Sequence, residues 1–324
     1  IVGFVLAGMI FGPFAIGGMI PFYENSLVEM NDLMLSVWQI SGIVILFSAG
    51  LHFTFHDLRR SGMKAASVGI GGVIVPLALG YFVTSGLGYG WQTAAIIGGT
   101  LSATSIAVAV SALEEIKKEK TVEGNILVNA AVLDDVLGIA ILSAILSIVV
   151  TNSIPTFEEI TFHVAEGIGF WFVILLGAVF LLPKIVHITS ITHPKTLESR
   201  GINQAIALGS AFGLAAIAGS IGLNPIIGAF AAGMGLAGSK LATQVREFVG
   251  RLKVIFIPLF FAVIGAHVNL LDVLSMNIIV FLAILGIAIS SKIIGCGIPS
   301  SLLLKNKKKG LRIGYGMIAR GEMP

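Results

Sequence analysis

The sequence predicts an all-α membrane protein that crosses the bilayer many times, and composition is the first reason. Of the 324 residues, 56% are hydrophobic and 11% are charged, whereas a soluble domain carries about 25% charged residues. The 40 glycines suit membrane helices that pack closely. Cys296 is the single cysteine, which excludes an internal disulfide and a cysteine-rich metal site.

Apolar segments long enough to span a bilayer are the second reason, since a membrane helix needs about 20 apolar residues. We place them near residues 1–18, 32–51, 64–86, 91–113, 124–150, 162–186, 202–220, 223–238, 253–273 and 277–304. An eleventh begins near residue 311. Because the chain both opens and ends within apolar sequence, we expect about 11 helices in a chain truncated at both ends.

The loops between these segments alternate in charge, which predicts their orientation. Lys and Arg occur after the second, fourth, sixth, eighth and tenth segments, in HDLRRSGMK, EEIKKEK, HPKTLESR, SKLATQVREFVGRLK and KNKKKGLR. The intervening loops contain neither residue. Because cytoplasmic loops are rich in Lys and Arg, we expect the first segment to start in the cytoplasm and the tenth to end there.

Two pairs of similar stretches predict inverted-topology repeats. GFVLAGMIFG at 3–12 resembles GAFAAGMGLAG at 228–238, and GLHFTFHDL at 50–58 resembles GAHVNLLDV at 265–273. In the expected topology, the two members of each pair cross the membrane in opposite directions. This architecture is common among secondary transporters, whose binding sites lie near the middle of the bilayer where the repeats meet.

Two adjacent carboxylates, Asp134 and Asp135, lie inside the apolar segment 124–150. An aspartate at the centre of a membrane helix costs at least ~2.5–3.5 kcal/mol on insertion scales. Such residues normally face a bundle interior or an aqueous cavity, and they serve ions or protons. A purely structural pair is the less favoured interpretation. Neighbours on a helix are ~100° apart, so the two carboxylates need not face the same partner.

Lys292 lies in the middle of the segment 277–304 and is the candidate counter-charge. The alternative is a lysine whose aliphatic stem reaches the membrane interface. We favour a salt bridge to one of the two aspartates.

The segment 91–113 contains hydroxyl groups that suit a sodium ion, at Thr100, Ser102, Thr104 and Ser105. Hydroxyl oxygens, and carbonyls freed at a helix break, are hard ligands that carboxylates can complete. Close packing of small residues explains Thr100 and Ser102 equally well. Thr104 and Ser105, in the middle of the span, are therefore the stronger candidates.

Three further polar residues are candidates to support this site. Asn129 lies shortly before the aspartates, although packing explains it equally well, and Arg320 and Glu322 in ARGEM are a candidate intramembrane pair. The sequence contains no phosphate-binding glycine loop, nucleophile motif or His/Cys metal spacing. We therefore expect a transporter that is not an enzyme, uses no cofactor and binds no nucleic acid.

Five stretches resemble the monovalent cation/proton antiporter superfamily. They are LVNAAVLDDVLGIAIL, LSATSIAVAVSALEE, PLFFAVIGAHVNL, SSKIIGCG and RGEM. The closest branch is the NapA type of Na⁺/H⁺ antiporter, which is related to Kef potassium-efflux proteins. The resemblance covers nearly the whole chain, and its most specific part is the aspartate pair with a downstream membrane lysine.

The resemblance implies an NhaA/NapA-like fold in which two discontinuous helices cross near the aspartates, in a homodimer. It implies a core ion-translocation part at about 64–150 and 277–324, a dimerisation or scaffold part at about 1–51 and 202–273, and a linking helix at 162–186. Thr104 and Ser105 would lie in the first crossing helix. By the matching motif, Asp135 would carry the ion and the proton, and Asp134 would pair with Lys292.

These features predict a secondary active antiporter that exchanges Na⁺ for H⁺ by alternating access, in the lipid of a prokaryotic cell membrane. Paired aspartates with a lysine resemble the electrogenic members. Asp-Asp, where Kef-type proteins usually have Gln-Asp, favours Na⁺ and leaves Li⁺ and K⁺ open. The alternatives are a K⁺/H⁺ antiporter, a sodium-coupled organic-anion symporter of the same architecture, and an ion channel.

Overall fold

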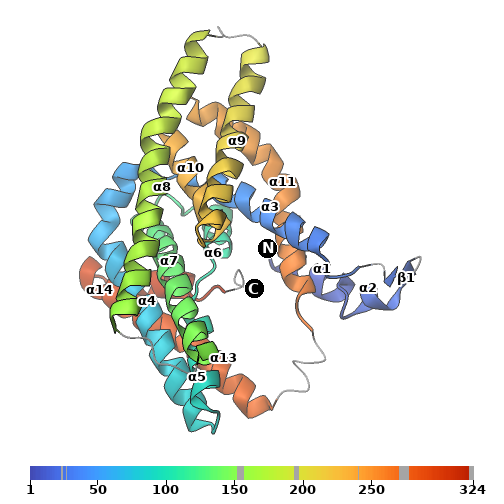
Figure 1. Cartoon of the computed structure of the whole chain (residues 1–324), viewed down its shortest axis with the longest axis vertical. Coiled ribbons are helices and arrows are strands. Elements are labelled where there is room, and N and C mark those ends of the chain that lie inside the picture. The colour runs from blue at the N-terminus through green and yellow to red at the C-terminus, as the bar shows by residue number, and fades with distance from the viewer. Residues whose placement is uncertain are drawn as a thin grey trace. The chain divides into compact units, whose positions relative to one another are not determined.

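The computed structural model of the chain describes residues 1–22, 25–26, 28–151, 157–192, 197–239, 241–269 and 277–320. The described chain is almost entirely α-helical (Figure 1), which confirms the predicted fold class. Among the described residues, the exception is a short antiparallel pair, β1 (Pro21–Phe22) with β2 (Asn25–Ser26).

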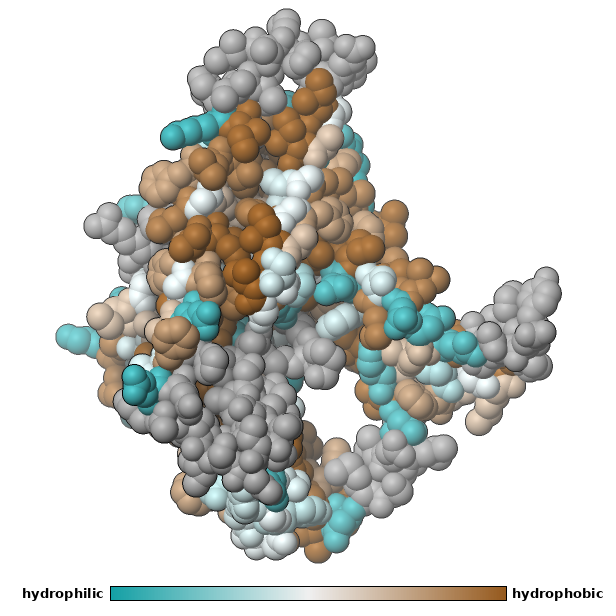
Figure 2. Space-filling model, in the orientation of Figure 1, coloured by the Kyte–Doolittle hydropathy of each residue, from teal (hydrophilic) through white to brown (hydrophobic). Residues whose placement is uncertain are grey.

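Eight helical stretches in the described parts are long and apolar enough to cross a membrane. They are Val2–Met19, Asp32–Gly50, Ser61–Gly86, Trp91–Glu115, Ala165–Ile185, Gly201–Ser220, Ala242–Ala266 and Ile278–Leu304. Large apolar side chains are exposed along α8 (Phe157–Thr192), for example Phe180 and Leu181. Hydrophobic residues gather over the part of Figure 2 where Figure 1 places α8 and α9. Such a surface suits lipid rather than water, and the chain is a multi-pass membrane protein.

The chain forms two compact units. The first comprises Ile1–Thr54, Ile174–Ser220 and Asn224–Met276, and the second comprises Phe55–Val173, Ile221–Leu223 and Asn277–Pro324. The boundary falls inside α8, which contributes to both units. The expected division of labour, with one part for ion translocation and one for dimerisation, stays a prediction.

The first unit is a helical bundle around α3 and α10. Its helices are α1 (Val2–Phe11), α2 (Ile16–Met19), α3 (Asp32–Gly50), α9 (Leu197–Ser220), α10 (Pro225–Ala237), α11 (Ala242–Ala266) and the second part of α8. Asn31 and Asn224 cap α3 and α10, because each side chain accepts a hydrogen bond from a backbone amide of the first turn. α10 packs against α3 and α9, and α11 packs against α1 and α3.

Matched glycine contacts support the inverted repeat within the first unit. A Cβ on Gly265 in α11 would lie 2.1 Å from the carbonyl oxygen of Val5 in α1. A Cβ on Gly50 in α3 would lie 2.2 Å from the carbonyl oxygen of Phe230 in α10. Gly50 and Gly265 are equivalent positions of the repeat, and so are Val5 and Phe230. α1 therefore packs on α11 as α10 packs on α3, through close backbone contacts that only glycine permits.

The second unit is organised around α4. Its other helices are the first part of α8 and α5 (Trp91–Ser102), α6 (Ile106–Glu115), α7 (Val122–Thr151), α13 (Ile278–Lys292), the π-helix η1 (Ile293–Gly297), α14 (Ile298–Leu304) and α15 (Lys307–Gly316). α4 (Phe55–Gly86) packs against α5, α7, α13 and η1. The span that contains α5 and α6 is interrupted at Ala103–Ser105, as expected for a discontinuous helix.

Several elements differ from the sequence expectation: α4 begins at Phe55, before the expected residue 64, and α10 and α11 differ as well. α10 has 13 residues and a length of about 20 Å, whereas the hydrocarbon core is ~30 Å thick. The expected span 223–238 is therefore a buried short helix. α11 begins at Ala242, before the expected residue 253. The expected loop SKLATQVREFVGRLK is largely helical because Val245 and Val249 form a buried stripe one turn apart.

Candidate functional site

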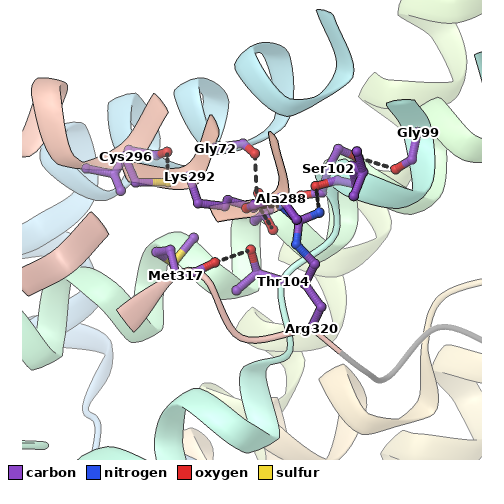
Figure 3. Close-up of polar contacts among 12 residues, drawn as sticks. Gly72, Gly99, Ser102, Thr104, Ala288, Lys292, Cys296, Met317 and Arg320 are labelled. Atoms are coloured by element: carbon purple, nitrogen blue, oxygen red, sulfur yellow. Dashed lines mark hydrogen bonds and ion pairs between the residues drawn. The ribbon is translucent and has the colours of Figure 1, made fainter. Parts of the chain in front are cut away.

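A fully buried ion pair joins α7 to α13 in the second unit, and its lysine, Lys292, is labelled in Figure 3. The ammonium nitrogen of Lys292 lies 3.1 and 3.2 Å from the two carboxylate oxygens of Asp134. It also donates to the carbonyl oxygens of Gly72, at 2.8 Å, and of Ser102, at 2.5 Å. Both side chains are 0% exposed. An ammonium has three donors, so these four oxygens use the whole donor capacity of Lys292.

Glycines on α4 make room for this pair. Gly71 and Gly295 approach each other reciprocally, because a Cβ on either would lie within 2.1 to 2.2 Å of the carbonyl oxygen of the other. A Cβ on Gly72 would lie 2.8 Å from Cys296 Sγ and 3.1 Å from Asp134 Oδ1. The backbone of α4 therefore comes close enough to η1 for the Gly72 carbonyl to accept from Lys292.

Lys292 is the last residue of α13, and the π-helix η1 follows it directly. π-Helical turns are rare, and they often mark functional sites. Gly295 and Gly297 lie inside this turn, which lowers the steric cost of its wider backbone. The π-helical turn and the buried Lys292 are therefore adjacent.

The break between α5 and α6 is joined to the chain that follows α15. The backbone amide of Ser105 donates to the carbonyl of Ala319 at 2.8 Å. The hydroxyl of Thr104 makes a longer contact, 3.5 Å, to the carbonyl of Met317. Ser105 also caps α6, since its hydroxyl oxygen accepts from the amide of Val108 at 3.1 Å. The break between α5 and α6 and the segment after α15 are thus hydrogen-bonded to each other.

Arg320 is a second cation at this break. Its guanidinium donates to the carbonyl of Leu101 at the end of α5, and to the carbonyl of Ala288 in α13 at 2.8 Å. The C-terminal end of a helix carries partial negative charge on unpaired carbonyls. Lys292 on Ser102 and Arg320 on Leu101 therefore both neutralise the buried end of α5.

The predicted site residues that the structure describes all belong to the second unit. Asp135, Thr104 and Ser105 are all buried, and Asp135 is 1% exposed. Glu322 lies outside the described residues, so its predicted pairing with Arg320 has no structural counterpart here. Asn129 is also buried, and its side chain forms hydrogen bonds with the side chains of Ser61 and Asn125.

Sequence reasoning missed the backbone ligands of Lys292. The carbonyls of Gly72 and Ser102 cannot be read from side-chain types, although the stretch GIGG at 69–72 was a signal for close backbone approach. The role of Arg320 as a cap for α5 was missed for the same reason.

Comparisons with known proteins place this geometry in a family. Residues 1–324 match the family described as sodium/hydrogen exchanger, transmembrane. The Na⁺/H⁺-K⁺ antiporter GerN of Bacillus cereus is 28% identical over 100% of this chain and 79% of GerN. The high-affinity Na⁺/H⁺ antiporter NhaS3 of Synechocystis sp. is 32% identical over 93% of this chain and 65% of NhaS3.

A solved structure shows the same fold. The sodium proton antiporter MjNhaP1 from Methanocaldococcus jannaschii at pH 8 has a TM-score of 0.63 to this chain. It is 18% identical, and the similarity covers 97% of this chain and 76% of that one. The resemblance seen in the sequence is confirmed, and the chain belongs to the sodium/hydrogen exchanger family of secondary transporters.

Proposed function

We propose that this protein exchanges Na⁺ for H⁺ at Asp135 by alternating access, in the cell membrane of a prokaryote. The observation that carries the proposal is the saturation of Lys292 by Asp134 and by the carbonyls of Gly72 and Ser102. Lys292 is thus committed to Asp134. We assign the exchange of a proton for a metal ion to Asp135, the buried neighbour of this pair on α7.

The chemistry is competition for one carboxylate. Ionised Asp135, with hydroxyl oxygens from Thr104 and Ser105, supplies the hard oxygen ligands that suit Na⁺. A proton that binds Asp135 removes its negative charge and releases the ion. The Lys292–Asp134 pair can release and take up a further proton, so we propose electrogenic exchange with more protons than sodium ions.

A cavity in the second unit supports access to this site from one side. Its volume is about 670 Å³, and side chains of α6, α7 and α15 line it. It extends to Ala319, whose carbonyl binds the amide of Ser105. Lys118, Glu123 and Arg312 also line it, and Glu123 lies 3.4 Å from Arg312. The basic loops nearby suit a cytoplasmic location, so we propose that this cavity is the cytoplasmic entrance.

The experiment is proton movement in proteoliposomes that contain the full chain and a pH-sensitive dye. We expect Asp135→Asn to abolish proton movement driven by Na⁺, because an amide cannot trade a proton for a cation. Glu158→Gln, which changes an exposed carboxylate on α8, is the matched control and should exchange at the wild-type rate. Normal exchange by Asp135→Asn would contradict the proposal.

The same assay separates the alternative ions and coupling modes. GerN carries K⁺ in its name, so Na⁺, Li⁺ and K⁺ are compared in one series. A response to K⁺ alone would identify a K⁺/H⁺ antiporter. Sodium that moves in the same direction as an organic anion would identify a symporter, and flux without fixed stoichiometry would identify a channel.

A further inference from the structure

A second group of polar side chains, two of them buried, lies between α4 and α7, apart from the ion pair. The side-chain amide of Asn129 donates to Ser61 Oγ at 2.7 Å and to Asn125 Oδ1 at 2.6 Å. Asn129 is 0% exposed, and Ser61 is buried as well. We refer to Ser61, Asn125 and Asn129 as the polar cluster. Placing three polar side chains at a helix interface inside a membrane protein costs free energy.

The polar cluster contains a buried oxygen that is not satisfied by the described protein atoms. Oδ1 of Asn129 is enclosed and accepts no hydrogen bond from them. Buried polar atoms in native proteins are nearly always hydrogen-bonded, to protein or to ordered water. A water molecule beside Asn129 would satisfy this oxygen, and it would bind in a polar setting of the kind that holds buried water.

A cavity leads to the polar cluster from the protein surface. Its volume is about 360 Å³, and Ser61 and Asn125 form part of its wall. Lys64, Lys120 and Thr121 are among the other lining residues. Ser61 and Asn125 therefore contact the cavity and also contact the fully buried Asn129.

The same helix interface continues from the polar cluster to the ion pair. Asn129 precedes Asp134 by five residues on α7, which is about 7.5 Å along the helix axis. On α4, Gly69 packs against the backbone of Ala130, and Gly72 contacts Asp134 and Lys292. The axial distance between Asn129 and Asp134 corresponds to two or three hydrogen-bond lengths of about 2.8 Å.

We propose that the polar cluster holds water for a proton route between the cavity beside Lys64 and the Asp134–Lys292 pair. The cavity beside Lys64 adjoins the cavity beside α6 and α15 that we assign to the metal ion, since Thr121 lines both, but the proton route leaves it along α4 and α7. No acidic residue is among the described residues that line the entrance of the proton route, whereas Glu123 accompanies the basic residues of the metal-ion cavity, so Lys64 and Lys120 repel Na⁺ and K⁺ more strongly here. Protons still pass, because they move between hydrogen-bonded water molecules. Asn129 orients the water and is a positioning residue, and no bond other than O–H or N–H changes along the route.

The inference rests on the proposed exchange activity, and the test is the split between maximal rate and KM. In proteoliposomes, Asn129→Leu removes the amide and fills the space for water. We expect its maximal exchange rate to fall roughly tenfold or more, since proton transfer steps contribute large factors to rate, while KM for Na⁺ stays unchanged. Asn129→Ser keeps a hydroxyl and leaves room for water, so it should exchange faster than Asn129→Leu.

Thr84→Val is the matched control. Thr84 is also a buried polar residue of α4, and its hydroxyl oxygen makes no hydrogen bond within the described residues. Its loss should leave the exchange rate unchanged. Wild-type rates in Asn129→Leu would overturn the proposal. A Ser variant as slow as the Leu variant, with raised KM for Na⁺ in both, would also overturn it, because that pattern indicates a packing role.

Thiol labelling gives a second measurement that does not need Asn129→Leu to fold. We expect Asn125→Cys to react with a small anionic methanethiosulfonate reagent, and the reaction to slow exchange. Cys296 is 0% exposed, so the wild-type chain is the unlabelled reference. Failure to react, or reaction without change in rate, would contradict the proposed route. Absence of cation-dependent proton movement in the wild type would instead refute the proposed function, and the accessibility of position 125 would still be measured.

Discussion

At the scale of single residues, the Asp134–Lys292 pair shows how a membrane protein keeps charges in its interior. Removing one partner of a buried ion pair costs about 3–5 kcal/mol, because the other charge remains without compensation. Here the lysine is held by Asp134 and by two backbone carbonyls. These contacts hold Lys292 in position, while protons are proposed to exchange at this pair and at its neighbour Asp135.

A double-mutant cycle tests the energetic coupling of the pair. We expect Asp134→Asn and Lys292→Met each to lower the temperature of unfolding in detergent. The double variant should lose less stability than the two single variants lose together, since it leaves no uncompensated charge. The coupling should be at least about 1 kcal/mol, within the range for residues in contact. Strictly additive effects would show that the two charges do not depend on each other.

At the scale of elements, glycine sets the distance between helices. Gly71 and Gly295 bring α4 and η1 into backbone contact, while Gly50 and Gly265 do the same at equivalent places of the first unit. A helix at this distance from its neighbour presents carbonyl oxygens, and the Gly72 carbonyl becomes a ligand of Lys292. The glycines therefore determine both the distance between the helices and which backbone oxygen binds Lys292.

Substitution of two glycines on α4 tests this relation. We expect Gly71→Ala to lower the unfolding temperature and to reduce exchange, because its Cβ would lie 2.1 Å from a backbone oxygen. Overpacking of this kind typically costs about 1–3 kcal/mol. Gly62→Ala is the matched control on the same helix, since no atom lies within 4 Å of its Cβ position. Equal behaviour of the two variants, in thermal unfolding and transport, would exclude the proposed close contact.

At the scale of the whole molecule, the distribution of Lys and Arg predicts the orientation in the membrane. Basic residues lie before α15 and between α6 and α7, whereas the connection between α4 and α5 contains none. A cytoplasmic position of the basic connections agrees with the positive-inside rule. We propose this orientation, together with the homodimer that the family resemblance implies.

Labelling of single cysteines in intact cells tests the orientation. We expect a membrane-impermeant maleimide to label Gly90→Cys, in the connection before α5, and not Lys308→Cys at the start of α15. Both positions are exposed, so burial does not explain a difference. Permeabilised cells are the control, in which both variants should react. Labelling of Lys308→Cys alone in intact cells would reverse the predicted topology.

The sequence by itself determined the fold class and the main charged residues of the site. Long apolar segments leave few alternatives to membrane helices, because the bilayer does not tolerate unpaired backbone groups. The charged residues Asp134, Asp135 and Lys292 stand out in the sequence because charged side chains are costly in an apolar membrane segment. Repeat symmetry was readable as well, from glycines at equivalent positions.

Only the tertiary structure decided how these residues are connected. Lys292 binds the backbone carbonyls of Gly72 and Ser102, and Arg320 binds a backbone carbonyl at the end of α5. The π-helix after Lys292 is likewise a feature of the backbone. Every residue type carries the same backbone groups, so sequence patterns do not mark which of them become ligands. The polar cluster at Asn129 is a second example, because its partner Ser61 lies 68 residues away in the chain. Such long-range neighbours are set by helix packing, and packing is a property of the folded molecule.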